Sequence, residues 1–268
     1  NDALVAQIGL SNGSNVLQNG ATNNSNVSQV GNTNIADMDQ FGDVNVGKID
    51  QSGSTHLATQ TQTGISNFAH VIQANANNSS TQVQEGNSNR AIAYQNKNDN
   101  GNTAPGEFNV ATQTQIGDSN YSIVTQGPYS NGSDNLASLR QEGDRNNQNA
   151  YQDWEYSSTS IQSQVGDDNQ SYTQQNAGGV NVADISQVGD SNISNTRQSY
   201  AHENTALVIQ DGGANDSNIY QEDGDYNFAK NTQTGDLNFS TVYQTGDLHS
   251  SIVNQNGSSN ISNVTQSN

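Results

Sequence analysis

Polar and apolar positions follow a period of two in short segments that recur along the whole chain. In segment 34–40, Asn34, Ala36, Met38 and Gln40 occupy every second position. A period of two is that of a β-strand, in which alternate side chains share one face, and not that of a helix. The order Asn, small residue, larger apolar residue, Gln recurs at 67–73, 181–187 and 238–244. The pattern predicts short β-strands joined by polar arcs.

Glutamine ends each segment, at 23 positions, and the intervals between successive glutamines form two classes. Every second interval is 11 residues long, whereas the others range from 11 to 20 residues. We call the connections of these two classes the fixed arcs and the variable arcs. Glycine stands two residues after Gln in all 11 fixed arcs but in only four of 11 variable arcs. A glycine at every equivalent position indicates a bend that needs a positive φ or a close backbone approach.

The residues that flank the fixed arcs recur at equivalent places in every repeat, and we call them the ladder positions. Six residues before each Gln the chain has Asn at 20 of 23 positions, the exceptions being His56, Ser158 and His249. The glutamines that precede the fixed arcs are Gln18, Gln40, Gln62, Gln84, Gln115, Gln141, Gln164, Gln187, Gln210, Gln233 and Gln255. The arc glycines are Gly20, Gly42, Gly64, Gly86, Gly117, Gly143, Gly166, Gly189, Gly212, Gly235 and Gly257. The asparagines that follow them are Asn23, Asn45, Asn67, Asn89, Asn120, Asn146, Asn169, Asn192, Asn215, Asn238 and Asn260.

Two strands and two arcs make one coil, so the sequence predicts an all-β fold, a two-sheet β-solenoid of about 11 stacked coils. We expect residues 1–268 to form a single solenoid, with the longest variable-arc insertions at 96–108 and 127–134. Stacking would place identical amides one rung apart, where they can bond up and down the stack.

Composition alone would suggest disorder, because only 29% of the 268 residues are hydrophobic and cysteine is absent. A disordered tract would not keep its register over the whole chain, so we expect amide ladders to replace a large apolar core. The net charge of −19 with only seven Lys and Arg argues against nucleic acid as a partner. No apolar run is long enough to predict membrane insertion.

The repeat resembles that of the curlins, the subunits of the extracellular amyloid fibres of bacterial biofilms. In segment 109–120 the strand is followed by Gln115, Gly117 and Asn120 in the order Gln-x-Gly-x-x-Asn, and this arc recurs in 11 copies. The chain has about twice as many coils as familiar curlins, and its repeats begin at Asn1 without the non-repetitive leader of that family. The resemblance implies a long-repeat variant of the major subunit, secreted to the cell surface, with a nucleator subunit and a curli-type secretion machinery as partners.

The segments 1–7 and 260–266 have the full strand pattern, so we expect head-to-tail self-assembly through uncapped end strands into a fibre that serves the biofilm matrix and adhesion. The alternative is a monomeric β-solenoid that acts as an adhesin or binds ice. Ice binding would need a flat outward Thr-x-Thr array on successive coils; 59–63 shows one such stretch, but it is not maintained from rung to rung. We expect no enzyme activity and no cofactor, because no Gly-x-Ser-x-Gly elbow and no His paired with a carboxylate is apparent.

Two sets of outward residues remain as candidate chemistry. Carboxylates three residues after Gln in the fixed arcs would stack into an acidic stripe, which either keeps the secreted chain soluble or captures divalent cations. The weak candidates for a metal site are Asp118, Asp144, Asp167 and Asp190. Aromatic residues and both prolines fall in the variable arcs, where they are either tolerated or used for lateral and partner contacts. These residues are Pro105, Phe108, Pro128, Tyr129, Trp154, Tyr156 and Tyr200.

Overall fold

The computed structural model describes residues 1–96, 106–127, 132–154 and 156–268, and within them all regular structure is β-strand. The first twelve strands are β1 (Asp2–Ile8), β2 (Gly13–Asn19), β3 (Asn24–Asn32), β4 (Ile35–Asp43), β5 (Val46–Ser54), β6 (Leu57–Ile65), β7 (Phe68–Ala76), β8 (Ser79–Asn87), β9 (Arg90–Gln95), β10 (Val110–Ile116), β11 (Tyr121–Gln126) and β12 (Leu136–Glu142). The others are β13 (Asn147–Asp153), β14 (Thr159–Val165), β15 (Gln170–Asn176), β16 (Val182–Val188), β17 (Ile193–Ser199), β18 (Thr205–Asp211), β19 (Asp216–Glu222), β20 (Phe228–Thr234), β21 (Phe239–Thr245), β22 (Ser250–Asn256) and β23 (Ile261–Ser267).

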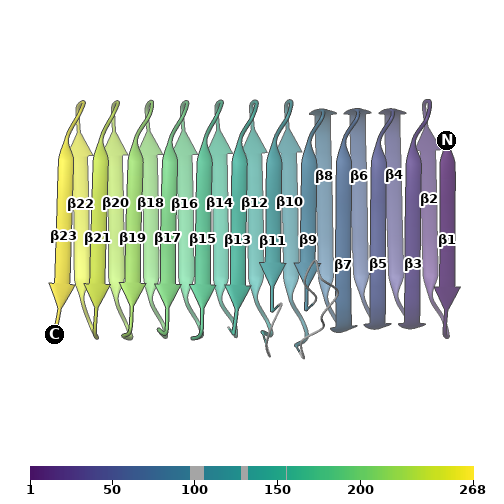
Figure 1. The fold of residues 1–268 in the computed structure, drawn as a ribbon, viewed down its shortest axis with the longest axis horizontal. Coiled ribbons are helices and arrows are strands. Elements are labelled where there is room, and N and C mark those ends of the chain that lie inside the picture. The colour runs from purple at the N-terminus through teal and green to yellow at the C-terminus, as the bar shows by residue number, and fades with distance from the viewer. Residues whose placement is uncertain (97–105, 128–131, 155) are drawn as a thin grey trace.

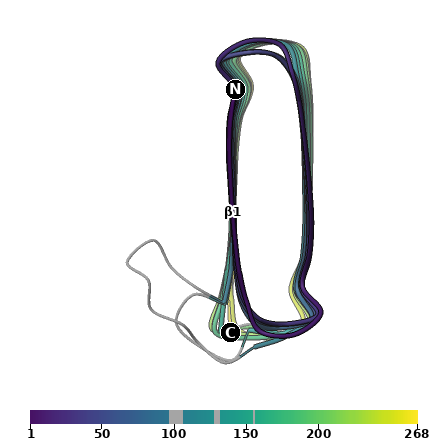
Figure 2. The same ribbon diagram turned by 90° about the vertical axis from the view of Figure 1, so that its right-hand side faces the viewer.

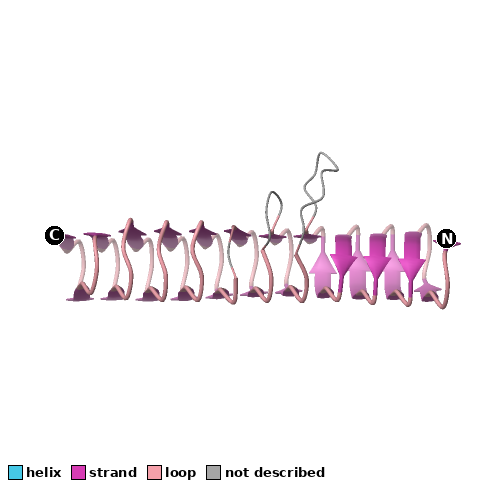
Figure 3. Cartoon of the chain, turned by 90° about the horizontal axis from the view of Figure 1, so that it is seen from below, coloured by secondary structure: helices cyan, strands magenta, loops and turns pink. Residues whose placement is uncertain are grey.

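The strands form two parallel sheets, so the predicted two-sheet β-solenoid of about 11 coils is confirmed. The odd-numbered strands make a 12-stranded sheet and the even-numbered strands an 11-stranded sheet, each in sequence order (Figure 1). Successive coils have nearly the same outline when the rod is viewed along its axis (Figure 2). An arc joins the two rows of strands in every coil (Figure 3). Each strand therefore pairs with its equivalent in the next coil, whereas its neighbour in sequence lies in the other sheet.

The register is the one that the glutamine spacing predicts. Gln18 pairs with Gln40 and Gln40 with Gln62 along one sheet, and Gln7 pairs with Gln29 along the other. The strands begin one residue after the predicted Asn, which ends the preceding arc. Insertions in the variable arcs leave the register unchanged, since Gln84 still pairs with Gln115 across 31 residues.

The sheets are nearly flat, with strands that run side by side from β1 to β23 without an evident propeller twist (Figure 1). Parallel sheets of many strands usually twist, and flat ones depend on stacking or side-chain ladders. A twist would rotate identical side chains away from one another, so the flatness indicates that the ladders dominate the packing.

The interior is a thin seam between the two sheets. Two apolar clusters occupy it, one from Val27 to Ala150 and one from Ile185 to Val253. Small residues such as Ala36 alternate with larger ones such as Met38, and both are buried. Between the two clusters the inward residues are polar, for example Gln162 and Thr173, and they are buried. The fold therefore does not depend on a continuous apolar core.

Polar residues at the apolar position of the repeat form a further interior feature that we did not predict. Gln60 donates to Gln82 at 2.9 Å and Gln82 donates to Gln113 at 2.7 Å, which makes a short third ladder. Asn231 is instead isolated between Val208 and Val253 in the stack. Its Nδ2 donates to Ser217 at 2.9 Å, but its buried Oδ1 has no hydrogen-bond partner. An unpaired buried carbonyl oxygen destabilises the fold by about 1–3 kcal/mol.

None of the described residues forms a helix of the length and apolar character that a membrane span requires.

We expect Asn231→Val to stabilise the chain by about 1 kcal/mol, because it removes the unpaired oxygen and joins the valines above and below. The reciprocal change, Val242→Asn, should destabilise by about 1–3 kcal/mol, since Val242 is buried between Ile219 and Val264 in the stack. Urea unfolding of the soluble chain, followed by circular dichroism, measures both changes. Destabilisation by Asn231→Val would show that the donor to Ser217 outweighs the unpaired oxygen.

Candidate functional site

The stacked glutamines form the most regular polar structure in the described residues. Along each sheet, the side-chain Nε2 of a ladder Gln donates to Oε1 of the Gln one rung further along the chain, at 2.7–3.1 Å, and the two ladders contain 11 and 10 such bonds. All of these bonds point the same way, from the lower-numbered to the higher-numbered rung. From Gln29 to Gln244 the ladder glutamines are at most 2% exposed.

From Gln18 onwards, the second N–H of each ladder amide connects the two sheets. Gln40, on β4, donates to the backbone carbonyl of Asn24, on β3, at 3.2 Å. Gln51, on β5, donates to the carbonyl of Ile35, on β4, at 3.0 Å. A glutamine side chain is long enough to reach both its equivalent in the next rung and the backbone across the seam. The Gln ladders therefore hold the coils together along the axis and also close each coil.

The stacked asparagines bond mainly to backbone, which differs from the amide-to-amide contacts that we expected for them. Oδ1 of Asn23 accepts from the backbone N–H of Asn45 at 2.9 Å, and Nδ2 of Asn23 donates to the carbonyl of Gly42 at 2.7 Å. Direct amide-to-amide bonds between ladder asparagines of successive coils supplement this pattern from Asn146 onwards, as in Asn169 to Asn146 at 3.2 Å. Earlier in the chain, Asn96 bridges Asn78 and Asn109 with bonds of 3.1 and 3.0 Å. Each asparagine thus fixes the fixed or variable arc of the next coil.

The three exceptions in the asparagine series keep part of the same bonding. Ser158 Oγ accepts from the N–H of Asn181 at 3.1 Å, and His56 Nδ1 faces the N–H of Asn78 at 3.4 Å. The N–H of His249 is bonded to Asn227 Oδ1 at 2.8 Å, like that of any ladder asparagine. The position therefore requires an acceptor toward the next rung, and asparagine is the residue that also supplies a donor.

Gly166 illustrates why the fixed arcs need glycine. Its φ is +113°, and a Cβ at this position would overlap the carbonyl oxygen of Gly189 in the next coil. That carbonyl accepts from Nδ2 of Asn169 at 2.7 Å. The backbones of adjacent coils can approach closely enough for this bond only where no side chain intervenes.

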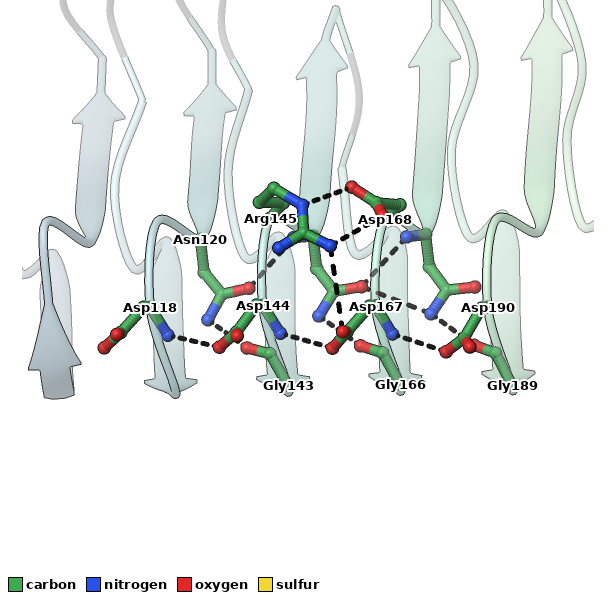
Figure 4. Close-up of polar contacts among 12 residues, drawn as sticks. Asp118, Asn120, Gly143, Asp144, Arg145, Gly166, Asp167, Asp168, Gly189 and Asp190 are labelled. Carbon is green, nitrogen blue, oxygen red and sulfur yellow. Dashed lines mark hydrogen bonds and ion pairs between the residues drawn. The ribbon is translucent and has the colours of Figure 1, made fainter.

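The acidic stripe of the fixed arcs is a backbone-capping ladder (Figure 4). Oδ1 of Asp144 accepts from the N–H of Asp118 at 2.8 Å, and Oδ1 of Asp167 accepts from the N–H of Asp144 at 2.8 Å. Asp190 repeats the contact with the N–H of Asp167 at 2.9 Å. Each carboxylate therefore satisfies a donor of the preceding coil, a structural role that the sequence analysis missed.

The stripe is accompanied by one cation, and no group of three or more metal-ligating side chains exists in the part of the chain that the structure describes. Arg145 donates to both carboxylate oxygens of Asp168 at 2.8 Å, and it lies 3.7 Å from Asp167 (Figure 4). This guanidinium lowers the pKa of the Asp168 carboxyl, mainly through the hydrogen bond. The geometry favours capping over the alternative of cation capture at Asp118, Asp144, Asp167 and Asp190.

His56 is the buried titratable group of the ladders. It is 1% exposed, and its Nε2 lies 3.3 Å from the carbonyl of Ser52. Burial lowers the pKa of His56 below its ordinary value of 6.5, against a smaller raising effect of the Ser52 carbonyl. In the neutral ring with its proton on Nε2, Nδ1 is free to accept from Asn78. If Nδ1 were protonated, its N–H would face the backbone N–H of Asn78, and the contact between these two coils would be lost.

The variable arcs carry the exposed aromatic side chains. Trp154, Tyr156, Tyr200 and Phe108 are all more than half exposed. Pro105, Pro128 and Tyr129 lie outside the described residues, as does most of the two expected insertions. Trp154 and Tyr200 line a pocket of about 360 Å³ together with Asn176 and Ala177. The expectation that no histidine pairs with a carboxylate was wrong for His70, whose Nε2 lies 3.1 Å from Asp50 because the two residues are on adjacent strands of one sheet. His202 is exposed on a variable arc.

Comparison with known proteins gives no matching family model and no match among curated proteins.

We expect Gln175→Ala to destabilise the chain by about 2–4 kcal/mol, because it creates a cavity and removes the ladder bonds to Gln152 and Gln198. The matched control is Gln174→Ala, which removes the neighbouring side chain from the opposite, half-buried face of the same strand and should change stability by no more than about 0.5 kcal/mol. Chemical unfolding of the soluble chain compares the two variants. Equal effects would mean that the ladder contributes no more than surface packing.

His56 makes the stability of the fold depend on pH. Because its folded-state pKa is depressed, the unfolded chain binds the proton more readily below about pH 6.5. The free energy of unfolding therefore decreases as the pH is lowered through this range, by at most about 1.4 kcal/mol per pH unit. His56→Asn should remove this part of the pH dependence and leave stability near pH 8 similar or higher. The exposed His202→Asn serves as the control and should leave the pH profile of the wild type unchanged. Parallel pH profiles for wild type and His56→Asn would contradict the assignment.

Proposed function

We propose that this chain is a structural subunit of an extracellular amyloid fibre, in which copies of the solenoid stack end to end. The resemblance of the repeat to the curlins supports this proposal, as does the two-sheet solenoid with buried Gln and Asn ladders. On this proposal the chain is not an enzyme, is secreted to the cell surface and forms a homopolymer that contributes to the biofilm matrix and to adhesion. A nucleator subunit and a curli-type secretion machinery would be its partners.

The observation that carries the proposal is the single direction of the glutamine ladder. Gln7 donates to Gln29 near one edge of the described sheets, and Gln244 donates to Gln266 near the other, both along the same direction. Any stack of this kind therefore has one outer edge with amide oxygens and one with amide N–H groups. The two edges are complementary in bonding as well as in shape.

Identical strand patterns at every rung extend this complementarity to the rest of the edge. The inward residues Ser262 and Val264 of β23 repeat the small and apolar positions of Ser240 and Val242, on which they stack. A further coil with the same pattern would continue the backbone hydrogen bonds, the glutamine ladder and the apolar seam together. Contact between copies would thus reproduce the contact between coils within one copy.

The acidic outer surface is compatible with this assembly. Most carboxylates lie in the arcs and on the outward faces of strands, although Asp2 is on the edge strand β1 and Asp153 is buried, and the net charge of −19 opposes non-specific association of monomers. The exposed charges repel one another when the outer faces of two copies approach, and salt weakens this repulsion. End-to-end stacking is therefore opposed less than lateral association.

The ice-binding alternative finds little support in the register. Thr59 stacks on Thr81 and Thr81 on Thr112, so one threonine column extends over three rungs. The adjacent column is interrupted, because Val83 lies between Thr61 and Thr114. A flat two-column threonine array is therefore not formed there.

The test is elongation of preformed seeds, followed by thioflavin fluorescence and electron microscopy. Wild-type chain should form fibres with a 4.8 Å meridional reflection along the fibre axis. Ser262→Lys with Val264→Lys places two charges at inward positions of β23 and should slow elongation at least about tenfold, because stacking would bury unpaired charges.

Asn263→Lys with Thr265→Lys is the matched control, since it adds the same charge to the same strand on its outward face. This variant should elongate like wild type. The proposal fails if the wild-type chain stays monomeric under these conditions, or if the inward variant elongates as fast as the outward one.

A further inference from the structure

Three variable arcs place Trp154, Ala177 and Tyr200 in one column. Each lies two residues after a ladder Gln, and backbone bonds connect the rungs: the N–H of Ala177 donates to the carbonyl of Asp153 at 3.1 Å, and the N–H of Tyr200 donates to that of Asn176 at 2.9 Å. The backbone positions that carry the indole and the phenol are therefore two rungs, or about 9.6 Å, apart, with only the methyl group of Ala177 on the rung between them.

This arrangement forms an open slot. Trp154 is 61% exposed and Tyr200 is 64% exposed, and with Asn176 and Ala177 they line the pocket of about 360 Å³. Two aromatic walls, a small floor and one amide are the composition of a site for a small ligand with apolar faces and a polar edge.

The backbone at the two walls is in a conformation that aromatic residues rarely adopt. The φ angle is +56° at Trp154 and +52° at Tyr200, in the left-handed region. The equivalent residues of the other 12-residue variable arcs have the same backbone, with φ of +59° at Ala177 and +53° at Asp223. The arc therefore sets this left-handed φ whichever residue is present, and it does not require a bulky ring, which costs conformational free energy there.

The surroundings restrict the charge of the ligand. Asp223 occupies the next position of the same column, one rung beyond Tyr200, and the exposed Glu203 lies on the same variable arc as Tyr200. These carboxylates oppose an anionic ligand. A second copy of this chain would bring its own net charge of −19 against the same edge.

We propose that this slot binds a neutral hexopyranose unit of a polysaccharide. A ring placed on the rung between them would lie about 4.8 Å from the rung of each aromatic residue, whereas carbon atoms make their best contact at about 3.5–4.0 Å. A flat aromatic ring is too thin to contact both walls at this spacing. The chair of a pyranose projects axial C–H groups from both faces and hydroxyl groups from its rim, so it contacts both rings while a hydroxyl bonds to the amide of Asn176.

The experiment uses Trp154, the only tryptophan of the chain, as its reporter. The 268-residue chain, kept soluble, is titrated with cellohexaose and with maltohexaose while indole emission is recorded. At least one hexamer should give a saturable change with a Kd of about 0.1–1 mM. Tyr200→Ala, which removes one wall, and Ala177→Leu, which fills the slot, should each weaken binding about tenfold or more.

Tyr226→Ala is the control, because Tyr226 is an aromatic residue outside the slot that is also more than half exposed and also has a left-handed backbone. Its loss should leave the Kd unchanged within about twofold. The proposal is overturned if neither hexamer changes the emission, if Tyr226→Ala weakens binding as much as Tyr200→Ala, or if anionic polygalacturonate binds as well as the neutral sugars. It is also overturned if the emission changes with protein concentration alone, which would assign the slot to a second copy. These outcomes do not depend on fibre formation, so they are separable from the proposed function.

Discussion

The hydrogen bond between stacked glutamine amides is the interaction on which the other features of this fold depend. A buried amide needs partners for two N–H groups and a carbonyl oxygen: the next rung supplies an acceptor for one N–H, the preceding rung supplies a donor to the oxygen, and a backbone carbonyl of the other sheet accepts from the second N–H. Gln40, for example, accepts from Gln18, donates to Gln62 and uses its second N–H on Asn24. The bond requires that each glutamine lie directly above the preceding one and that its amide point the same way. These requirements keep the sheets flat and the register fixed through every insertion.

The two arc classes lie on opposite sides of the rod, one with arcs of constant length and one with arcs of varying length. In the fixed arcs, Asn146, Gly166 and Asp167 each bond to an adjacent coil, so an added residue would break several contacts at once. The variable arcs keep the asparagine contact but have fewer of the others, and they accommodate extra residues. Exposed aromatic residues such as Trp154 are found on this edge because its backbone tolerates changes that the other edge excludes.

The sequence predicted those features that follow from register alone. Identical residues at a constant spacing must coincide once the coil is assumed, and this gave the sheets and the glutamine ladder. The short ladder of Gln60, Gln82 and Gln113 could have been found in the same way, since these residues share one position of the repeat. The backbone contacts of Asn23 and the capping role of Asp144 could not, because they depend on the path of the arc. The slot beside Ala177 likewise depends on arc shape, which the spacing does not encode.

The direction of the ladder gives the rod a polarity that side-chain composition does not reveal. Reversing the amide of Gln141 would bring its N–H groups against those of Gln115 and its oxygen against that of Gln164, so two contacts would become repulsive. Each amide therefore fixes the orientation of its neighbours, and the whole ladder takes one direction or the other. Aligned amide dipoles also polarise one another and strengthen each bond in the chain. A coil added at either edge joins an orientation already set, which favours ordered continuation of the stack over unaligned association.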